Sequence, residues 1–426
     1  MAVDPPTALA GDAALVERGG TLWCEGVALS DLADSVGTPC YVYSETLIRR
    51  RYAAFSAAFA AVPHRIFYSV KANHNVSILR LMHGLGAGAD VVSAGELYRA
   101  RRAGFAGREI VFGGVGKRSD ELEAALEAGV LFVNVESEGE LRLLAELAGA
   151  RGVVAPVALR VNPGVEAGKH AFTQTGHYKT KFGVAWEEAE RLYEFAAASR
   201  HLAPVAIDTH IGSQILSAEP YDRALERLGQ LLNGISRRGI KLRYLDMGGG
   251  FGVPYEGEAE IDLAAVARSA GKLAVEFNLT CAVEPGRWLV APAGVLLTRV
   301  LYMKRLGEQN YCVVDAGSND FLRPSYYGAR HPVEAVRRGE PAIEVDVVGP
   351  VCETGDFLGR ACLLPATDAG DLLAVLFAGA YGAVMSSNYN SRPRAAEVLV
   401  SGDAHRVIRR RESLEDLLAA EVADDE

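Results

Sequence analysis

The sequence has few cysteines for its length, and they are widely separated. Among 426 residues there are six cysteines, and no two of them form a Cys-x-x-Cys pair: Cys24, Cys40, Cys281, Cys312, Cys352 and Cys362. This spacing argues against a disulfide framework and against a thiolate metal site, and it favours reduced thiols. We therefore expect a cytoplasmic protein without a bound metal.

The chain also lacks a surplus of positive charge and a long apolar run. Its formal net charge is −10, which argues against nucleic acid or an anionic membrane as the main partner. No stretch approaches the length of a membrane span, and the acidic N-terminus does not have the pattern of a signal peptide. With 49% hydrophobic and 23% charged residues, the composition is typical of a soluble globular protein of two domains.

A third absence concerns the first strand of the predicted fold. A Gly-x-Gly-x-x-Gly usually follows that strand in an open dinucleotide-binding sheet, and here residues 71–73 are Lys-Ala-Asn. What the chain does contain is a regular alternation of eight apolar, strand-like runs with helix-like segments. The predicted strands are 65–71, 88–93, 109–113, 130–135, 156–161, 204–210, 241–247 and 279–284. Eight such units over roughly 220 residues predict a (β/α)8 TIM-like barrel, with an open doubly wound sheet as the alternative.

The pattern changes near residue 290. Apolar runs at 293–303, 311–315, 343–348 and 372–378 are separated by turn-rich loops, which predicts an all-β domain, either a β-barrel or a sandwich. Residues 20–43 carry strand signals at both ends and are expected to add a strand to it. We therefore predict a barrel domain over 45–290 and a discontinuous β domain over 1–44 plus 291–426.

The carboxyl ends of the predicted strands carry residues suited to a ligand. Lys71 closes the first strand, where its amine is placed to form a Schiff base at the mouth of a barrel. Residues 248–250, all glycine, follow the seventh strand, and 285–287 (Pro-Gly-Arg) follow the eighth. This fold often binds phosphate in those two loops, and Ser213 offers a further hydrogen bond. Glycine in a loop is weak evidence by itself, because most loop glycines only form turns.

A lysine, a phosphate site and an acid together indicate pyridoxal phosphate. Glu284, at the end of the eighth strand, is placed to face the pyridine nitrogen and to keep it protonated, so that the ring withdraws electrons. His210 is placed against the ring face. The alternatives are a salt bridge between Glu284 and Arg287 and an ordinary buried histidine at position 210.

Three residues of the predicted β domain have a possible chemical role. Cys352 lies beside Glu353 in a turn, and the specific hypothesis is a general acid that protonates a carbanion. The alternative is that this cysteine is a small core residue, which is the more common case. Arg323 and Tyr327 offer a clamp for a carboxylate. The loops 379–382 and 386–390 are polar and aromatic, and such loops are commonly only turns.

Taken together, these segments resemble the diaminopimelate decarboxylases, which are fold-type III pyridoxal-phosphate enzymes. The matching motifs are YSVKAN (68–73), NPG (162–164), TGHYKTKFG (175–183), HIGSQ (210–214), GGGFG (248–252), EPGR (284–287), RPSYY (323–327), GPVCETGDFLG (349–359), GAYG (379–382) and MSSNYNSRPR (385–394). They span nearly the whole chain in the family's order. The resemblance implies a βα barrel followed by a β domain. One departure is Trp288, where the family more often has a small residue.

The resemblance implies a role for each matched residue. The implied catalytic residues are Lys71, which carries the cofactor, Cys352, which donates a proton, and His210. The implied cofactor-binding residues are Lys71, His210, Ser213, Gly249, Gly250, Glu284, Gly286, Arg287 and Tyr381. The implied substrate-binding residues are Arg287, Arg323, Tyr327, Glu353 and Tyr381. The resemblance also implies a homodimer in which the Cys352–Glu353 loop reaches into the partner's site.

The resemblance implies decarboxylation of meso-2,6-diaminopimelate to L-lysine, the last step of lysine biosynthesis. Arg287 and Arg323 suit the distal carboxylate, and an ornithine-type substrate would leave two guanidinium groups unpaired. The first alternative is decarboxylation of ornithine, lysine, arginine or carboxynorspermidine. The second is an alanine-racemase-like reaction, for which an acid at the pyridine nitrogen would be unfavourable. The third is a non-catalytic cofactor carrier, which would be expected to have lost Lys71 or Cys352.

Overall fold

The computed structural model describes residues 7–8, 14–165 and 181–422, and the chain divides into two compact units. Unit 1 consists of Met1–Arg51, Pro254–Glu258 and Leu289–Glu426, and unit 2 consists of Tyr52–Val253 and Ala259–Trp288. Among the described residues, no helix has the length and apolar character needed to cross a membrane.

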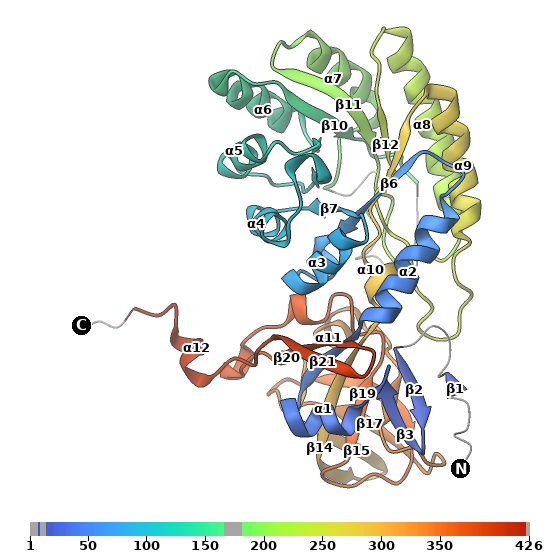
Figure 1. Ribbon diagram of the computed structural model, residues 1–426, viewed down its shortest axis with the longest axis vertical. Helices are drawn as coiled ribbons and strands as arrows, with labels where there is room; N and C mark the ends of the chain where they lie inside the picture. Colours follow the sequence, from blue (N-terminus) through green and yellow to red (C-terminus); the bar gives the residue numbers. More distant parts are fainter. Residues whose placement is uncertain (1–6, 9–13, 166–180, 423–426) are drawn as a thin grey trace. The chain divides into compact units, whose positions relative to one another are not determined.

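Unit 2 contains a closed barrel of eight parallel strands (Figure 1). The strands follow one another around the barrel in chain order, and the last pairs with the first. They are β6 (His64–Ser69), β7 (Gly88–Val91), β8 (Ile110–Phe112), β9 (Phe132–Val135), β10 (Ala155–Arg160), β11 (Leu202–Asp208), β12 (Tyr244–Asp246) and β13 (Thr280–Val283). The predicted (β/α)8 barrel is confirmed, and the open doubly wound sheet is excluded.

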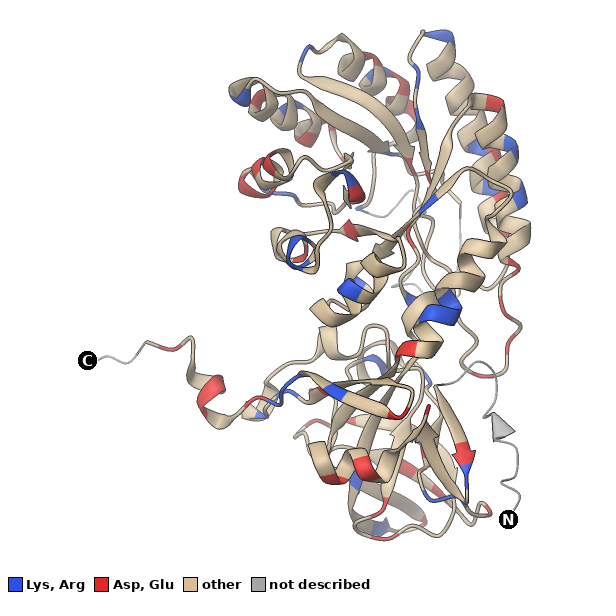
Figure 2. Cartoon of the chain, in the orientation of Figure 1, with Lys and Arg blue, Asp and Glu red and all other residues tan. Residues whose placement is uncertain are grey.

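Helices connect the strands and surround the barrel (Figure 1). They are α3 (Val76–Gly84), α4 (Ala94–Ala103), α5 (Ser119–Ala128), α6 (Glu138–Arg151), α7 (Trp186–Ala198), α8 (Glu219–Arg237) and α9 (Leu263–Phe277). Helix α2 (Glu45–Ala58) precedes β6, and the short α10 (Arg287–Val290) follows β13. Helix α8 shows why they pack as they do: Leu225, Leu228 and Leu232 recur at helical spacing on its buried face. Charged residues of both signs lie along these helices (Figure 2), where they form surface ion pairs such as Arg142–Glu138.

Apolar side chains fill the interior of the barrel. The core cluster contains Phe67, Val111, Phe132, Ala158, Val205, Ala206 and Ala282. Small residues on some strands face large rings on others, so the interior is a packed core and not a pore. Polar side chains such as Ser69, Asp90 and Asp246 are buried as well, and they mark the end of the barrel where the strands finish.

Unit 1 is built mainly from β-sheets. Its largest sheet follows the order β18-β17-β15-β14-β5-β20-β21, with β16 and β19 joined to it through β14. These strands are β5 (Cys40–Ser44), β14 (Gly294–Leu306), β15 (Gln309–Val314), β16 (Val333–Ala335), β17 (Ile343–Val348), β18 (Phe357–Leu364), β19 (Leu372–Val375), β20 (Ala396–Ser401) and β21 (Ala404–Arg409). The predicted C-terminal all-β fold is confirmed.

The first 44 residues contribute to the same unit. Strand β5 pairs antiparallel with β14 and parallel with β20, so it lies in the interior of the large sheet. A second, four-stranded sheet has the order β1-β2-β3-β4. Its strands, and the helices of unit 1, are β1 (Thr7–Ala8), β2 (Leu15–Arg18), β3 (Thr21–Cys24), β4 (Val27–Ala28), α1 (Leu29–Val36), α11 (Arg323–Tyr327) and α12 (Leu414–Leu418).

Some local predictions need correction. The first strand was expected to run to Lys71, but β6 ends at Ser69 and Lys71 lies in a 3₁₀ turn, η1 (Val70–Ala72). The prediction also omitted β16, β18, β20 and β21. Strand β18 contains Gly359 and several exposed positions, so its sequence lacks the apolar alternation that reveals a half-buried strand.

Candidate active site

Lys71 is held at the carboxyl end of the barrel by an acid from the next strand. Its Nζ lies 2.9 Å from Oδ2 of Asp90 on β7, and Ser69 Oγ donates to the same oxygen at 2.9 Å. Asp90 is buried, whereas the Lys71 side chain is 35% exposed. The amine is therefore fixed in direction and still accessible to a small molecule.

Glu284 follows β13, the strand that pairs with β6. Its side chain is buried, and its Oε1 atom has no hydrogen-bond partner among the described residues. Asp246, at the end of β12, is a neighbouring acid whose side chain is buried as well. Burial raises the pKa of Glu284 well above its ordinary range, and the neighbouring Asp246 raises it further. Burial raises the pKa of Asp246 to about 6.

Glu284 makes no ion pair with Arg287 within the described chain, so that alternative is wrong. The Arg287 guanidinium instead donates through Nη2 to Ser213 Oγ at 3.0 Å. The contact joins the loop after β11 to the residues after β13. Arg287 is almost fully buried, which places its charge inside unit 2 rather than on the surface.

Acids outnumber bases at this end of the barrel. Asp208 at the end of β11 is buried, and burial together with the charge of Asp246 raises its pKa well above the ordinary value. Lys71 pairs with Asp90, and Arg160 pairs with Glu136 at 2.9 Å. Burial thus favours the uncharged form of Asp208, while the charged groups around it form the two ion pairs.

His210 is a neutral ring in this environment. Burial lowers its pKa well below the ordinary value, and the charges of Arg160 and Lys71 lower it further. Its Nδ1 accepts a hydrogen bond from the Gly249 N–H at 3.0 Å, so the proton of the neutral ring lies on Nε2. His210 thus has a satisfied hydrogen bond, as the structural alternative supposed. The same bond fixes the orientation of its ring at the end of the barrel, so the two interpretations are compatible.

Three glycines permit a close approach of the backbone at the same place. A Cβ at Gly249 would lie 2.3 Å from the carbonyl oxygen of Glu284. Gly250 has a φ of +93°, and its Cβ would lie 2.5 Å from the carbonyl oxygen of Gly212. A Cβ at Gly286 would lie 2.9 Å from the Cβ atoms of Ser69 and Ala72. Any larger residue would fill the space through which backbone N–H groups reach an anion.

Comparison with known proteins identifies this arrangement. Residues 45–291 match the family model described as pyridoxal-dependent decarboxylase, pyridoxal binding domain. A diaminopimelate decarboxylase of Pseudomonas aeruginosa is 48% identical over 405 residues, which cover 95% of this chain and 97% of that protein. The chain belongs to the diaminopimelate decarboxylase family.

Solved structures of this family have the same fold. Diaminopimelate decarboxylase from Helicobacter pylori, complexed with L-lysine, has a TM-score of 0.89 at 41% identity and covers 92% of this chain and 99% of its own. The enzyme from M. jannaschii, in co-complex with L-lysine, has a TM-score of 0.93 at 33% identity, with 97% and 99% covered. The likeness therefore extends over nearly the whole chain.

Pyridoxal phosphate is the cofactor of this family, and the residues of unit 2 fit it. The barrel end offers a primary amine at Lys71 and a buried acid at Glu284 whose Oε1 atom lacks a partner. It also offers glycine turns next to the Arg287–Ser213 pair, which suit a phosphate. The eight residues predicted in this unit to bind the cofactor all lie at or just beyond the carboxyl ends of the strands.

In unit 1, Arg323 is surrounded by aromatic rings. Its guanidinium carbon lies 5.7 Å from the ring centre of Tyr255, 5.8 Å from that of Tyr327 and 5.9 Å from that of Tyr381. The structure thus brings together three of the residues predicted to bind the substrate. The guanidinium is buried, and the rings stabilise its charge through their faces.

A histidine orients Arg323. The Arg323 Nε donates to His331 Nε2 at 3.2 Å, while His331 Nδ1 lies 2.9 Å from the carbonyl oxygen of Leu376. The carbonyl can only accept, so Nδ1 carries the proton and Nε2 is the acceptor. His331 therefore fixes one edge of the guanidinium.

Cys352 and Glu353 lie together on an exposed loop of unit 1. The thiol is exposed, whereas Cys24, Cys40, Cys281 and Cys312 are buried, so the view of Cys352 as a core residue is wrong. Its backbone N–H donates to Asn390 Oδ1 at 2.9 Å, and Tyr389 Oη donates to Glu353 Oε1 at 2.7 Å.

Some residues of the site were not predicted. Asp90 and Asp246 were read only as parts of apolar strands, although an acid inside such a run is itself a signal of a buried polar role. His331 had no such signal, and Tyr389 and Asn390 were noted only as part of the polar and aromatic loop 386–390 and of the motif 385–394. Residues 175–180 of the TGHYKTKFG motif lie outside the described residues. Trp288, the departure from the family pattern, is buried, and its ring packs edge-on against Phe55 at 5.5 Å.

Proposed function

We propose that this protein catalyses the pyridoxal-phosphate-dependent decarboxylation of meso-2,6-diaminopimelate to L-lysine and CO2, the last step of lysine biosynthesis. The observation that carries the proposal is the placement of Lys71 and Glu284 at the ends of two paired strands, β6 and β13. An accessible amine and a buried acid on neighbouring strands suit opposite parts of one pyridoxal ring. Relatives of this chain with 48% identity are named for this activity.

The residues of the barrel hold and polarise the cofactor. When bound, pyridoxal phosphate supplies an electron sink that makes loss of CO2 from the amino acid possible. Lys71 would hold its aldehyde carbon, and Glu284 would face the ring nitrogen and keep that nitrogen protonated. His210 would present a neutral ring. The phosphate would be held by Ser213, Gly249, Gly250, Gly286, Arg287 and Tyr381.

The residues of unit 1 bind the distal end of the substrate and return a proton. Arg323 and Tyr327, together with Arg287, would bind the distal carboxylate, because a planar guanidinium pairs with a carboxylate through two hydrogen bonds. Glu353 would bind the distal ammonium. When the carboxylate leaves as CO2, its bonding electrons remain at Cα, and the Cys352 thiol donates its proton to that carbon and becomes a thiolate.

The domain and partner arrangement is part of the same proposal. We assign cofactor binding to the barrel domain, residues 45–290, and the proton donor to the β domain, residues 1–44 plus 291–426. The protein is proposed to act in the cytoplasm as a homodimer in which the Cys352–Glu353 loop serves the site of the partner subunit. The exposure of both residues on one loop supports this arrangement.

CO2 release from a panel of amino acids tests the function. With pyridoxal phosphate added, we expect turnover of meso-diaminopimelate and none of the LL- and DD-stereoisomers, ornithine, lysine or arginine. Lys71→Ala should abolish both turnover and the visible absorbance of the lysine-bound cofactor. Lys241→Ala, at an exposed lysine of the same unit, is the matched control and should change neither. Visible absorbance that survives in Lys71→Ala would rule out the proposed anchor.

A further inference from the structure

The loop that carries Cys352 and Glu353 has a rigid base. Asp356 accepts hydrogen bonds from the backbone N–H of Val351 at 2.7 Å and of Ser318 at 2.6 Å, and Gly349 N donates to its carbonyl oxygen at 3.1 Å. A Cβ at Gly349 would lie 2.5 Å from Asp356 Oδ2, so the turn is tightly closed. Cys352 and Glu353 stand at the exposed tip, beyond this base.

A second segment, residues 386–394, contacts the tip. Asn390 Oδ1 accepts the backbone N–H of Cys352 at 2.9 Å, and Tyr389 Oη donates to Glu353 Oε1 at 2.7 Å. Asn390 thus holds Cys352, and its neighbour Tyr389 holds Glu353. One bond acts on the backbone of the thiol residue and the other on the carboxylate.

The second segment is itself anchored on both sides of these two residues. Glu412 accepts hydrogen bonds from Asn388 Nδ2 at 2.6 Å and from the backbone N–H of Arg394 at 2.8 Å. Arg392 Nη2 donates to the carbonyl oxygen of Asp315 at 3.0 Å. Because its ends are fixed, the segment provides a firm support for the tip.

The backbone of the segment turns sharply where it meets the tip. Asn390 has a φ of +56° and Ser391 a φ of +53°. Asparagine tolerates this left-handed conformation better than most residues, and here it also supplies the acceptor for Cys352. Asn390 and Ser391 therefore share the left-handed backbone conformation, and the side chain of Asn390 also holds the tip.

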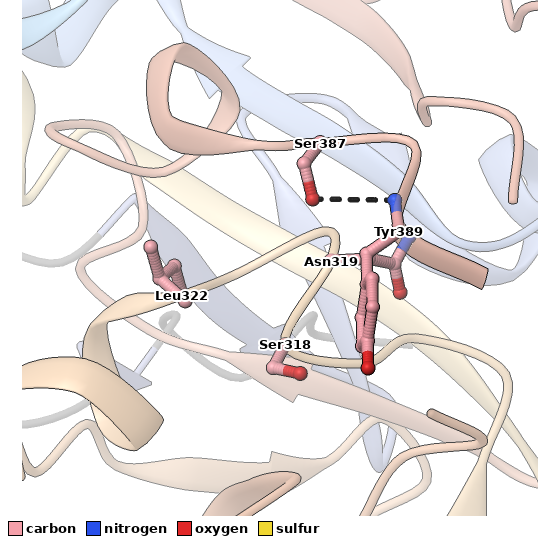
Figure 3. A pocket seen from close by; sticks show the side chains of 5 residues that line it. All are labelled: Ser318, Asn319, Leu322, Ser387 and Tyr389. Carbon is pink, nitrogen blue, oxygen red and sulfur yellow. Dashed lines mark hydrogen bonds between the residues drawn. The ribbon is translucent and has the colours of Figure 1, made fainter. Parts of the chain in front are cut away.

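The ring of Tyr389 is only partly packed. It lines an open pocket of about 480 Å³ together with Ser318, Asn319, Leu322 and Ser387 (Figure 3). The Tyr389 backbone N–H donates to Ser387 Oγ at 3.4 Å, which places the start of the side chain. With the ring half-exposed on one side, the phenol oxygen depends on the Glu353 carboxylate for its position.

We propose that Asn390 and Tyr389 are positioning residues for the reaction, Asn390 for the thiol of Cys352 and Tyr389 for the carboxylate of Glu353. This inference rests on the proposed function, in which Cys352 donates the proton and Glu353 binds the distal ammonium. Glu353 uses Oε1 for Tyr389, and its Oε2 makes no hydrogen bond within the described chain. That second oxygen is the one directed to an ammonium group. The two anchors therefore have different kinetic signatures.

Asn390→Gly tests the first anchor in the holoenzyme. Glycine accepts the left-handed backbone without strain and removes the side chain that accepts from Cys352. We expect kcat on meso-diaminopimelate to fall about tenfold, since small misplacements of a reacting group are costly, with KM within about twofold of the wild type. Ser391→Gly gives the same backbone freedom one residue later and should leave kcat unchanged. Equal losses in the two variants would assign the effect to the backbone and overturn the proposal.

Tyr389→Phe tests the second anchor. The ring remains and only the hydroxyl that holds Glu353 is lost. We expect KM for meso-diaminopimelate to rise about fivefold, as for the loss of one hydrogen bond, with kcat within about twofold. Tyr302→Phe, at an exposed tyrosine of β14, is the control and should change neither. A fall in kcat at unchanged KM would contradict the role of Tyr389.

A double variant separates positioning from a general structural effect. If Asn390 acts through Cys352, then Asn390→Gly should reduce kcat by less than about twofold in a Cys352→Ala background. A further tenfold loss in that background would show that Asn390 acts elsewhere, and the proposal would fail.

Alkylation of Cys352 by iodoacetamide tests the first anchor without turnover. The modified peptide is followed by mass mapping. In the holoenzyme, the rate of Cys352 alkylation should change at least about threefold in Asn390→Gly and remain unchanged in Ser391→Gly. This measurement distinguishes two failures. If the wild type releases no CO2 from meso-diaminopimelate, the proposed function is wrong and the alkylation rates still decide the anchor. If turnover is normal and the alkylation rates are equal in both variants, only the anchor is wrong.

Discussion

Glu284 and Asp246 influence each other although they follow different strands. An isolated carboxyl group titrates near pH 4 in water. Burial raises the pKa of both acids, and the neighbouring Asp246 raises that of Glu284 further, to well above its ordinary range. A single residue at this site therefore owes its chemistry to a neighbour. Substitution of Asp246 should lower the pKa of Glu284.

Gly250 occupies a position where a side chain would clash with the backbone. In Gly250→Ala, the new Cβ would lie 2.5 Å from the Gly212 carbonyl oxygen at a φ of +93°. We expect a loss of about 3 kcal/mol in the free energy of unfolding and weaker binding of pyridoxal phosphate. Gly370→Ala, at a φ of +96° with no atom within 4 Å of the Cβ, provides the control.

The comparison of Gly250→Ala with Gly370→Ala separates the effect of the steric clash from that of the backbone strain. Gly370→Ala should cost only about 1–2 kcal/mol, and cofactor binding should be normal. Denaturant unfolding and cofactor titration measure the two effects. Equal values for the two variants would mean that the space next to Gly212 is not needed.

At the scale of elements, the starts of α4 and α6 are built in the same way. Ser93 Oγ accepts the Glu96 N–H at 3.2 Å, and Glu96 Oε2 accepts the Val92 N–H at 2.8 Å. Ser137 and Glu140 repeat both bonds at the start of α6. The common sequence Ser-x-Gly-Glu is a capping signal, and it places each helix directly after a barrel strand.

The partly buried cap of α4 makes stability depend on pH. Burial raises the pKa of Glu96 to about 7. The folded state thus binds this proton more tightly than the unfolded state, so the stabilisation is complete below about pH 4.5 and is lost as the pH rises to 7. Glu96→Gln keeps the oxygen acceptor and removes the proton. Between pH 4.5 and 7, the apoprotein of this variant should gain on the order of 3 kcal/mol relative to the wild type.

Urea unfolding at a series of pH values measures this difference. Glu138→Gln on α6 is the control, and its effect on the free energy of unfolding should depend on pH in the opposite direction. Hydrogen bonds from Arg191 and Arg142 lower the pKa of Glu138 to about 2, and its contribution is therefore lost as the pH falls. A pH-independent difference between Glu96→Gln and the wild type would show that Glu96 is ionised in the folded state.

At the scale of the whole molecule, the proposed shared site predicts complementation. Lys71→Ala and Cys352→Ala each remove one part of the site, and a mixed dimer holds one complete set. Co-expression of the two variants should restore activity to about one quarter of the wild-type sites, because half of the randomly formed dimers are mixed and each has one intact site. Co-expression of two differently tagged Lys71→Ala chains is the control and should remain inactive. Mixed dimers without activity would contradict a site made from two chains.

The architecture was largely predictable, because eight apolar runs with helices between them allow few arrangements. Lys71 and Glu284 were found because residues after barrel strands are where this fold places its chemistry. Asp90 and Asp246 were missed because they lie within the strands, where an apolar pattern conceals them. The contact between Asn390 and Cys352 joins two loops that are 38 residues apart, and no local pattern encodes such a contact.

The position of β5 between β14 and β20 has a consequence for synthesis of the chain. β5 (Cys40–Ser44) leaves the ribosome about 250 residues before β14 (Gly294–Leu306) exists, a delay on the order of 10 to 50 seconds at ordinary translation rates. During that time an apolar strand waits with both edges open while the barrel forms behind it. A nascent chain stalled after the barrel would therefore be exposed to aggregation through β5, and it would be a natural client for a ribosome-associated chaperone.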